Sequence, residues 1–324
     1  MSTQAPVQQV SVVATARLHM GFLDLNGSLG RRFGSVGLSL DQPATRLTLT
    51  PAQGFSAEGF SSDRILRIAQ AFAEQAGLSS GADIHVHAAI PAHAGLGSGT
   101  QMSLAVGVAL ARLYRLPLTV REIAALTGRG ARSGIGVGAF EAGGLLVDGG
   151  RGAATQVPPL IARMEFPGQW RVLLIFDAAA TGVHGGEESE AFRALPAFPA
   201  GQSAEICRRV LMQGLPSLAE EDLPGFGAAI HALQCFVGDH FAAAQGGGRY
   251  TSPRVGDVLE WLRSRGIGCV GQSSWGPTGF AVIAAEAEAQ GVMRDCLERY
   301  SQVEGLSFLI CGARNRGSAV DVAC

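Results

Sequence analysis

Residues 91–100 read PAHAGLGSGT and place three glycines, a serine and a threonine directly before a long apolar run. Backbone N–H groups of such a loop can converge on one point, and the first turn of a following helix adds partial positive charge. The loop is therefore a candidate anion site, formed by Gly95, Leu96, Gly97, Ser98, Gly99 and Thr100. Its spacing matches neither the Walker A motif nor the dinucleotide fingerprint, so from the loop alone a structural turn is an equal alternative.

All 25 basic residues are arginine, because the chain contains no lysine. A composition bias is the simplest explanation. Whatever its origin, the absence of lysine excludes a Schiff-base lysine, a pyridoxal-phosphate lysine and a P-loop lysine. An anion must then be bound by arginine, backbone N–H groups, hydroxyls or a metal. The net charge of −2 gives no general basic field, which predicts no nucleic-acid partner.

The first predicted strand covers residues 7–18, and two polar residues lie at its end or just beyond it. Arg17 and His19 occupy alternate positions, so their side chains face the same side of the strand. They are candidate substrate-binding residues, with a purely structural role as the alternative.

The polar loop that follows carries a carboxylate, an amide and two arginines. Asp24 has the hard oxygen chemistry of a magnesium ligand, and Asn26 lies two residues beyond it. An aspartate that caps its own loop is the structural alternative for Asp24. Arg31 directly follows a glycine and is a better phosphate candidate than Arg32, which is expected to be solvated.

Histidines occur in two further segments that could bind a metal or move protons. His184 and Glu187, followed by Glu188, lie in a loop after a predicted buried strand, where an exposed acidic loop is the alternative. His85 and His87 share one face of a predicted strand. No third ligand is apparent for them, which favours a solvated strand face over a metal site.

Late in the chain, the segment GQSSWGPTGF carries hydroxyls and an aromatic ring. Ser273 and Ser274 could hydrogen-bond phosphate or ribose, and Trp275 could stack on an aromatic ring or simply pack in the turn. Arg314 and Arg316 follow the last predicted strand, and an arginine there could pair with a phosphate or a carboxylate.

Hydrophobic periodicity predicts two domains of mixed strands and helices, an α+β protein rather than a regular βαβ repeat. Pro158, Pro159 and Pro167 mark the boundary between residues 1–160 and 161–324. The predicted strands are residues 7–18, 44–52, 82–90, 170–178, 267–274, 279–285 and 306–313. Helices are predicted over residues 62–76, with Gly77 as a C-cap, over 101–114, from an N-cap at Thr119, and near 203–213, 225–245, 253–265 and 285–300.

The string P-x-x-x-G-L-G-S-G, running into a helix of small residues, resembles the second motif of the GHMP superfamily, which includes galactokinase, homoserine kinase and mevalonate kinase. In that superfamily the loop wraps the phosphates of a nucleotide. The resemblance implies a GHMP-kinase-like fold. Its N-terminal α/β domain would contain a left-handed βαβ-type unit, and its C-terminal domain would be a ferredoxin-like α+β domain.

Four segments in order (ARLHMGFLDLNGSLGRRFGSVGLSL, TGVHGGEESEAF, GQSSWGPTGF and ARNRG) resemble the β-ribofuranosylaminobenzene 5'-phosphate synthases of that superfamily. The resemblance implies joining of 5-phosphoribosyl 1-diphosphate to 4-aminobenzoate or 4-hydroxybenzoate, with loss of carbon dioxide and pyrophosphate, in tetrahydromethanopterin biosynthesis. It also implies Mg²⁺ at Asp24, no redox cofactor and a homodimer. The implied catalytic residues are Asp24, Arg31, His184 and Glu187, and the implied substrate-binding residues are Arg17, His19, Asn26, residues 95–100, Ser273, Ser274, Trp275 and Arg314.

Two other functions compete with this one. An ATP-dependent kinase of the superfamily is disfavoured because Gly136 stands where such kinases often carry an aspartate and because lysine is missing. A non-catalytic ligand-binding member is disfavoured because Asp24, Arg31 and the HGxxE loop need not persist in a scaffold.

The six widely spaced cysteines include no C-x-x-C pair, and the first residues lack the pattern of a signal peptide. These features predict reduced thiols and a cytoplasmic location. No stretch has the length and apolarity of a membrane span, so no membrane association is expected.

Overall fold

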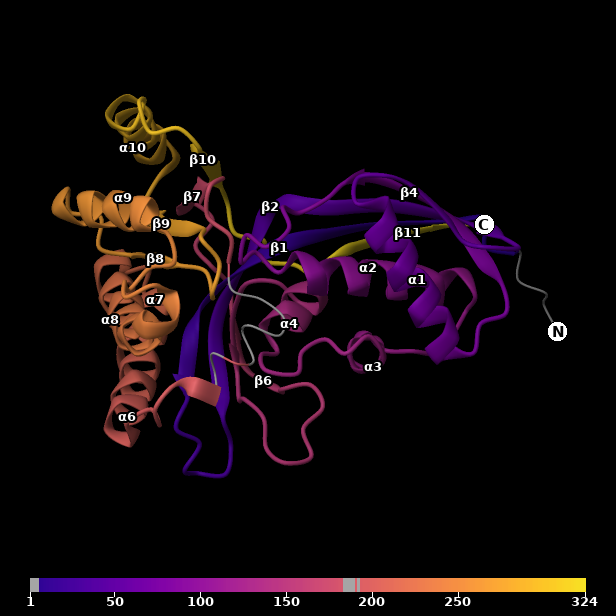
Figure 1. Cartoon of the computed structure of the whole chain (residues 1–324), viewed down its shortest axis with the longest axis horizontal. Helices are drawn as coiled ribbons and strands as arrows, with labels where there is room; N and C mark the ends of the chain where they lie inside the picture. Colours follow the sequence, from indigo (N-terminus) through magenta and orange to yellow (C-terminus); the bar gives the residue numbers. More distant parts are fainter. Residues whose placement is uncertain (1–5, 183–189, 191–192) are drawn as a thin grey trace.

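The computed structural model describes residues 6–182, 190 and 193–324, and it contains two β-sheets with helices packed on their faces (Figure 1). The strands are β1 (Gln9–Asp24), β2 (Phe33–Ala52), β3 (Ser56–Gly59), β4 (Gly81–Ala88), β5 (Leu145–Asp148), β6 (Leu160–Met164), β7 (Arg171–Asp177), β8 (Val270–Gln272), β9 (Gly279–Ile283), β10 (Leu306–Cys311) and β11 (Ala319–Ala323). The longer helices are α1 (Ser62–Ala76), α2 (Ser98–Leu113), α6 (Ala200–Arg209), α8 (Leu223–Phe241), α9 (Pro253–Ser264) and α10 (Glu286–Arg299). The short helices are α3 (Val120–Leu126), α4 (Ile135–Glu141), α7 (Leu215–Ala219), the π-helix Val210–Gly214 and the 3₁₀ helix Ala242–Gln245.

The first sheet is built around the two longest strands, in the order β11-β1-β2-β4-β3, and in addition β5 pairs with β2 and β6 pairs with β5. Helix α2 lies on β1 and β2, and α1, α3 and α4 pack against α2. The side chains of α2 are buried on almost every face of the helix, which is the pattern of a helix enclosed by other elements. Strands β3 and β4, which precede and follow α1 in the sequence, pair in parallel. The three elements form the predicted βαβ unit, whose handedness stays a prediction.

Local signals placed several helix ends correctly. Gly77 ends α1 in the left-handed conformation, with φ 67°, and donates its N–H to the carbonyl of Glu74. Thr119 and Glu122 form a complete capping box at the start of α3. Both features depend on residues a few positions apart, so they are readable from the chain itself.

The second sheet has four strands in the order β10-β7-β9-β8, with every neighbouring pair antiparallel. Counted along the chain the order is 4-1-3-2, which is the ferredoxin-like arrangement expected for this half. Leu173 and Ile175 of β7 face a core with α9 and α10. Val172 and Leu174 face the opposite core, with α8 and the second half of β1.

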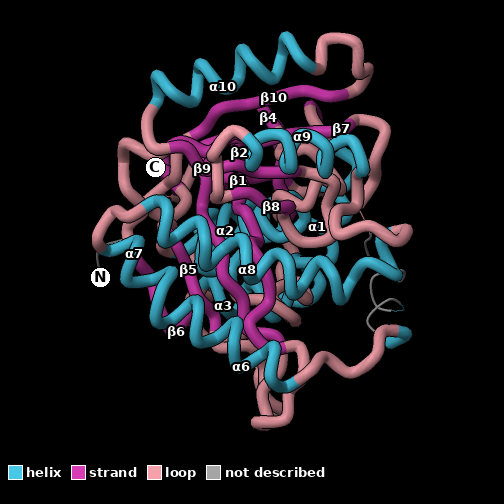
Figure 2. The backbone as a smooth tube through the Cα atoms, turned by 90° about the vertical axis from the view of Figure 1, so that its left-hand side faces the viewer, coloured by secondary structure: helices cyan, strands magenta, loops and turns pink. Residues whose placement is uncertain are grey.

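Strands β1 and β2 join the two halves of the molecule (Figure 1). Residues 10–14 of β1 pack with α1 and α2, whereas residues 16–25 pack with α6 and α8, which cross in front of β1 in Figure 2. The prediction that the strand ends near residue 18 is wrong, because β1 continues to Asp24. His19 to Leu23 lack polar–apolar alternation because both faces of the strand are covered there.

Two segments at or after the predicted boundary at residue 160 pair in the first sheet. Strand β6, Leu160–Met164, pairs with β5 in the first sheet. The final strand β11, which the sequence did not indicate, returns to pair with β1. Because β11 is short and partly exposed, it has few apolar positions from which a pattern could be read.

Candidate functional site

The glycine loop ends directly at the N-terminus of α2, as its sequence predicts. Gly97 is the N-cap, with φ 80°, and Gly95 has φ 76°, conformations that favour glycine. A Cβ at position 95 would lie 2.3 Å from the carbonyl oxygen of Ser273. A Cβ at position 97 would lie 3.2 Å from the Arg17 guanidinium carbon. These glycines therefore let the loop backbone approach two other segments closely.

Three segments that are far apart in the sequence meet at this loop. Ser273 Oγ donates to the Gly95 carbonyl at 2.7 Å and accepts the His19 N–H at 3.0 Å. The Ser274 N–H donates to the His19 carbonyl at 3.0 Å, and the Arg17 N–H donates to the Leu96 carbonyl at 3.1 Å. The end of β1, the glycine loop and the turn after β8 thus form one hydrogen-bonded unit.

A cleft of ≈ 350 Å³ opens over this unit. Three arginines line it, together with the glycine loop, the turn after β8, His93 and Gly182. The lining residues are Arg17, Arg64, His93, Gly95, Gly97, Ser98, Gly99, Thr100, Arg129, Gly182, Ser274, Trp275 and Gly276. Arg17 reaches the loop from β1 and donates to the Gly95 carbonyl at 2.5 Å. Arg64 comes from α1, and its Nη2 lies 2.9 Å from where a Cβ of residue 99 would be.

Positive charge in the cleft is not balanced by acidic side chains of the described residues. Arg129 donates from Nε to Ser103 Oγ at 3.1 Å, and burial, followed by the charge of Arg64, lowers its pKa. Within residues 6–182, 190 and 193–324, neither Arg64 nor Arg129 has a carboxylate within ion-pair distance. Two like charges held together in this way are stabilised when an anion binds between them.

Sequence reasoning missed Arg64 and Arg129. Arg64 sits in the first turn of an amphipathic helix, where an arginine is normally a solvated residue. Arg129 lies in the glycine-rich segment TGRGARSG, which offered a weak signal. Only the packing of α1 and this segment beside α2 brings both guanidinium groups to the loop.

Asp24 is bound within its own hairpin loop. Its Oδ1 accepts the N–H groups of Asn26 and Gly27 at 2.8 and 3.0 Å and the Ser203 hydroxyl at 2.9 Å. Asn26 donates to the Phe198 carbonyl at 2.6 Å. Seven residues of β1 place Asp24 roughly 20 Å from Arg17. The loop-capping alternative is thus present, and the roles of Asp24 and Asn26 toward substrate or metal stay predictions.

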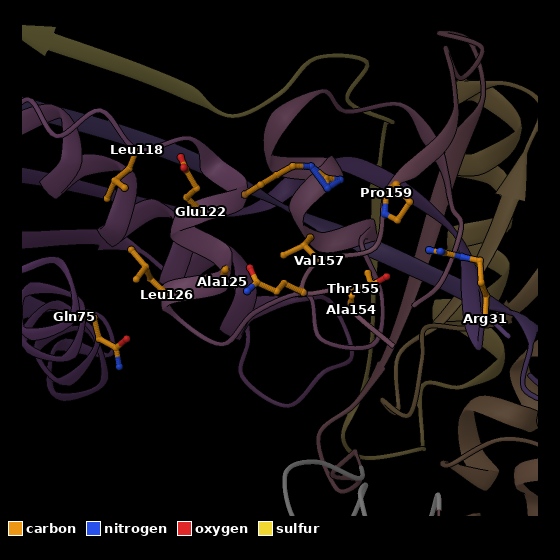
Figure 3. Close-up of a pocket in the computed structure, with 12 residues that line it drawn as sticks. Arg31, Gln75, Leu118, Glu122, Ala125, Leu126, Ala154, Thr155, Val157 and Pro159 are labelled. Atoms are coloured by element: carbon orange, nitrogen blue, oxygen red, sulfur yellow. The ribbon is translucent and has the colours of Figure 1, made fainter. Parts of the chain in front are cut away.

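Arg31 lines another cavity, of ≈ 860 Å³, rather than the cleft over the glycine loop. Its Nε and Nη2 both donate at 2.8 Å, to the carbonyls of Gly149 and Gly150. Figure 3 shows Arg31 at one end of this cavity, beside Thr155 and Pro159. Arg31 therefore does not line the cleft over the glycine loop, and its catalytic role stays a prediction.

His19 and Trp275 are buried, with 3% of each residue exposed. Neither His19 ring nitrogen has a hydrogen-bond partner among the described residues, and the ring packs edge-on against Phe22. Burial, with a smaller effect of the Arg17 charge, lowers the pKa of His19 to about 3, so its imidazole is neutral. Trp275 packs at 4.2 Å between ring centroids against Phe241, and its stacking on a substrate stays a prediction.

The other predicted residues lie apart from the cleft or outside the described residues. The Arg314 guanidinium donates to the Gly317 carbonyl at 3.0 and 2.9 Å, within its own loop. His85 and His87 lie on the exposed face of β4 and contact Glu58 and Thr48, respectively. His184 and Glu187 fall within residues 183–189, which are not described.

Gly136 lies in α4 and packs against the first turn of α2. A Cβ at this position would lie 3.0 Å from Thr100 Cγ2, and the Gly136 carbonyl accepts from Gln101 Nε2 at 2.7 Å. An aspartate here would require Thr100 to move. Position 136 is therefore packed tightly against the first turn of α2.

Comparison with known families identifies both halves of the chain. Residues 63–144 match the family described as GHMP kinases N terminal domain, and residues 215–302 match the family described as GHMP kinases C terminal. No described helix of the protein has the length and apolar character needed to cross a membrane.

Curated relatives share much higher identity than the structural neighbours do. The β-ribofuranosylphenol 5'-phosphate synthase of Archaeoglobus fulgidus is 36% identical over 95% of this chain and 98% of its own. That of Methanocaldococcus jannaschii is 34% identical over 68% of this chain and 75% of its own.

Among solved structures, Lactococcus lactis galactokinase complexed with galactose has a TM-score of 0.71 at 14% identity, covering 96% of this chain and 95% of its own. Homoserine kinase from Cytophaga hutchinsonii has a TM-score of 0.68 at 14% identity, covering 99% of this chain and 100% of its own. At these identities the likeness establishes the fold.

Proposed function

The chain belongs to the β-ribofuranosylphenol 5'-phosphate synthase family of the GHMP kinase superfamily, and from this membership we propose a specific reaction for it. The names of its relatives indicate an enzyme that makes a ribofuranosyl phosphate. The proposed reaction joins 5-phosphoribosyl 1-diphosphate to a para-substituted benzoate, 4-aminobenzoate or 4-hydroxybenzoate. It releases carbon dioxide and pyrophosphate, and the enzyme is a decarboxylating pentosyl transferase of tetrahydromethanopterin biosynthesis.

One observation carries the proposal: three arginines converge on a glycine loop at a helix N-terminus, and the described lining of that cleft contains no acidic side chain. Backbone N–H groups, the α2 dipole and guanidinium groups all favour a polyanion such as a diphosphate. The diphosphate would be the leaving group here, rather than the donor of a phosphoryl group.

The chemistry needs binding, orientation and charge neutralisation. The C1–oxygen bond of the ribose breaks, and its electron pair leaves with pyrophosphate. The ring carbon that bears the carboxylate then forms the new bond to C1. Carbon dioxide departs, and the electron pair of the broken carbon–carbon bond restores the aromatic ring. Arg17, Arg64, Arg129 and the loop N–H groups would stabilise the negative charge that develops on the leaving group.

The product that forms would identify the aryl acid. The relatives are named for a ribofuranosylphenol, and decarboxylative coupling of 4-hydroxybenzoate would give such a product. The same attack by 4-aminobenzoate would give the aniline. The two acids differ only in the group that donates electrons to the ring, so both belong in the assay.

Magnesium is not supported by the described donor set. Mg²⁺ is usually held by one or two carboxylates together with substrate phosphates. The described lining of the cleft offers the hydroxyls of Ser98 and Thr100 but no carboxylate, and Asp24 lies in the distant hairpin loop. The described residues of the cleft therefore do not form a magnesium site.

The assay incubates the protein with Mg²⁺, 5-phosphoribosyl 1-diphosphate and each aryl acid, and measures pyrophosphate and carbon dioxide. Equimolar release of both is expected with at least one acid, and R112Q, an exposed change on α2 outside the cleft, should leave the rate unchanged. Formation of ADP from ATP without pyrophosphate would instead identify a kinase. No turnover with either acid or with ATP would favour a ligand-binding member or an enzyme for a different aryl acid.

A homodimer and a cytoplasmic location remain part of the proposal, suggested by the family resemblance and by the cysteine pattern. Light scattering during size-exclusion chromatography measures the first.

A further inference from the structure

A larger cavity continues directly from the cleft over the glycine loop. It has a volume of ≈ 730 Å³ and shares Arg64, His93 and Arg129 with the cleft. Its remaining walls come from one face of α1, from Ser103 of α2 and from residues 126–128. A ligand bound at the glycine loop can therefore extend past Arg64 and Arg129 without leaving the protein surface.

The cavity has its own arginine, Arg67, which does not line the cleft. Arg67 lies three residues after Arg64 on α1, so their Cα atoms are about 4.5 Å apart along the helix axis. Its Nε donates to the Asp63 carbonyl at 3.2 Å, and its terminal nitrogens form no hydrogen bond with the described residues. Arg67 thus presents two donors toward the cavity, one helical turn beyond the loop.

The charge of the combined space is entirely positive in the described part of the chain. The cleft and the cavity together contain four arginines, Arg17, Arg64, Arg67 and Arg129, and neither described lining contains an aspartate or glutamate. This distribution occurs in a chain whose net charge is −2. Arginines gathered at two adjacent places fit a ligand with two separate anionic groups.

From this arrangement we infer that the cavity beside Arg67 is a second phosphate subsite, which binds the 5-phosphate of the ribose substrate while the glycine loop binds its 1-diphosphate. The inference rests on the proposed function, which supplies a substrate with phosphate groups at both ends of a ribose. Arg64 and Arg129 lie between the two subsites. Arg67 is a specificity-determining residue, because it distinguishes a ribose diphosphate that carries a 5-phosphate from one that lacks it.

The test compares three ligands by calorimetry: 5-phosphoribosyl 1-diphosphate, inorganic pyrophosphate and ribose 5-phosphate. The R67Q variant should bind 5-phosphoribosyl 1-diphosphate and ribose 5-phosphate about tenfold more weakly than the wild type, as expected for loss of one charge-assisted contact. Its affinity for pyrophosphate should change by less than about twofold, because Arg67 does not line the cleft. R67K, which keeps the charge, should recover most of the lost affinity.

The matched control is R112Q, which removes the same charge from the same half of the molecule. Arg112 is exposed in the last turn of α2, about 20 Å along the helix from Gly99. A comparable loss in R112Q would reduce the effect to general electrostatics and would overturn the subsite.

The outcomes separate this inference from the proposed function. If the wild type binds pyrophosphate and 5-phosphoribosyl 1-diphosphate but R67Q binds both as the wild type does, the second subsite is wrong and the diphosphate cleft stands. Equal weakening of both ligands in R67Q would also overturn the subsite. If the wild type binds neither ligand, both proposals fail. Binding of ATP with higher affinity than 5-phosphoribosyl 1-diphosphate would assign the cavity to a nucleoside and overturn the inference.

Discussion

Gly95 is the residue at which local conformation and long-range packing make the same demand. Its φ of 76° is unfavourable for a side chain, and its Cα lies against the turn that contains Ser273 and Gly276. The Gly95 carbonyl also accepts hydrogen bonds from Arg17 and Ser273. A change at this one position therefore disturbs the loop, the arginine and the turn together.

Gly95→Ala is expected to destabilise the protein by about 2–4 kcal/mol, because backbone strain adds to a steric conflict with the Ser273 carbonyl. Gly77→Ala is the matched control, since Gly77 has a similar φ of 67° but open space around it. The control should cost only about 1 kcal/mol. Urea denaturation of both variants measures the difference. Equal losses would show that the contact with the turn contributes nothing.

At the scale of elements, helices α1 and α2 have different tasks in the site. Helix α2 supplies its N-terminus and is otherwise enclosed in the core. Helix α1 buries one face with Ile65, Ala69 and Phe72, which leaves Arg64 at the edge of the cleft and Arg67 in the adjoining cavity. The position of α1 beside α2 is fixed by apolar packing, so Arg64 is placed without a side-chain hydrogen bond to the described residues.

Arg64→Gln should separate binding from stability. The Arg64 side chain has no hydrogen bond or ion pair with the described residues, and its charge lies near that of Arg129. Its removal should leave the free energy of unfolding unchanged or slightly higher, while pyrophosphate affinity falls about tenfold. Thermal denaturation and calorimetry on the same preparation give both values. A marked loss of stability with unchanged affinity would assign Arg64 a structural role.

At the scale of the whole molecule, His19 lies where the two halves meet. It belongs to β1, its backbone binds the turn after β8, and its ring packs in the core shared with α8. The pKa of His19 is lowered to about 3 by burial and by Arg17, whereas an unfolded chain keeps the ordinary value near 6.5. The unfolded state therefore binds a proton more readily than the folded state between these values.

This difference predicts acid destabilisation of the entire fold. The free energy of unfolding receives the full contribution of His19 above pH 6.5, and this contribution is lost as the pH falls toward 3. By pH 5 the loss is up to about 2 kcal/mol. His19→Gln removes the titrating group, so its stability should decline less steeply between pH 7 and pH 5. Asp41 and Asp148 have raised pKa values, again through burial, and act in the opposite direction in both proteins. Parallel pH profiles for the two proteins would contradict the assignment.

The sequence by itself determined the features that depend on nearby residues or on a recurring motif. The glycine loop, the caps at Gly77 and Thr119, the α+β class and the superfamily could all be predicted, because their signals lie within a few positions. The resemblance also placed the glycine loop and the late GQSSW segment together among the substrate-binding residues, and one hydrogen bond, from Ser273 to the Gly95 carbonyl, joins the two segments.

Only the tertiary structure decided which charged groups share a space. It brought Arg64 and Arg129 to the glycine loop, and it held Arg31, Arg314 and Asp24 against backbone groups elsewhere. It also extended β1 to Asp24 and returned β11 to the first sheet. An arginine looks the same in sequence whether it is solvated or faces a cleft. The difference arises from apolar packing of helices and sheets, which acts between residues far apart in the chain.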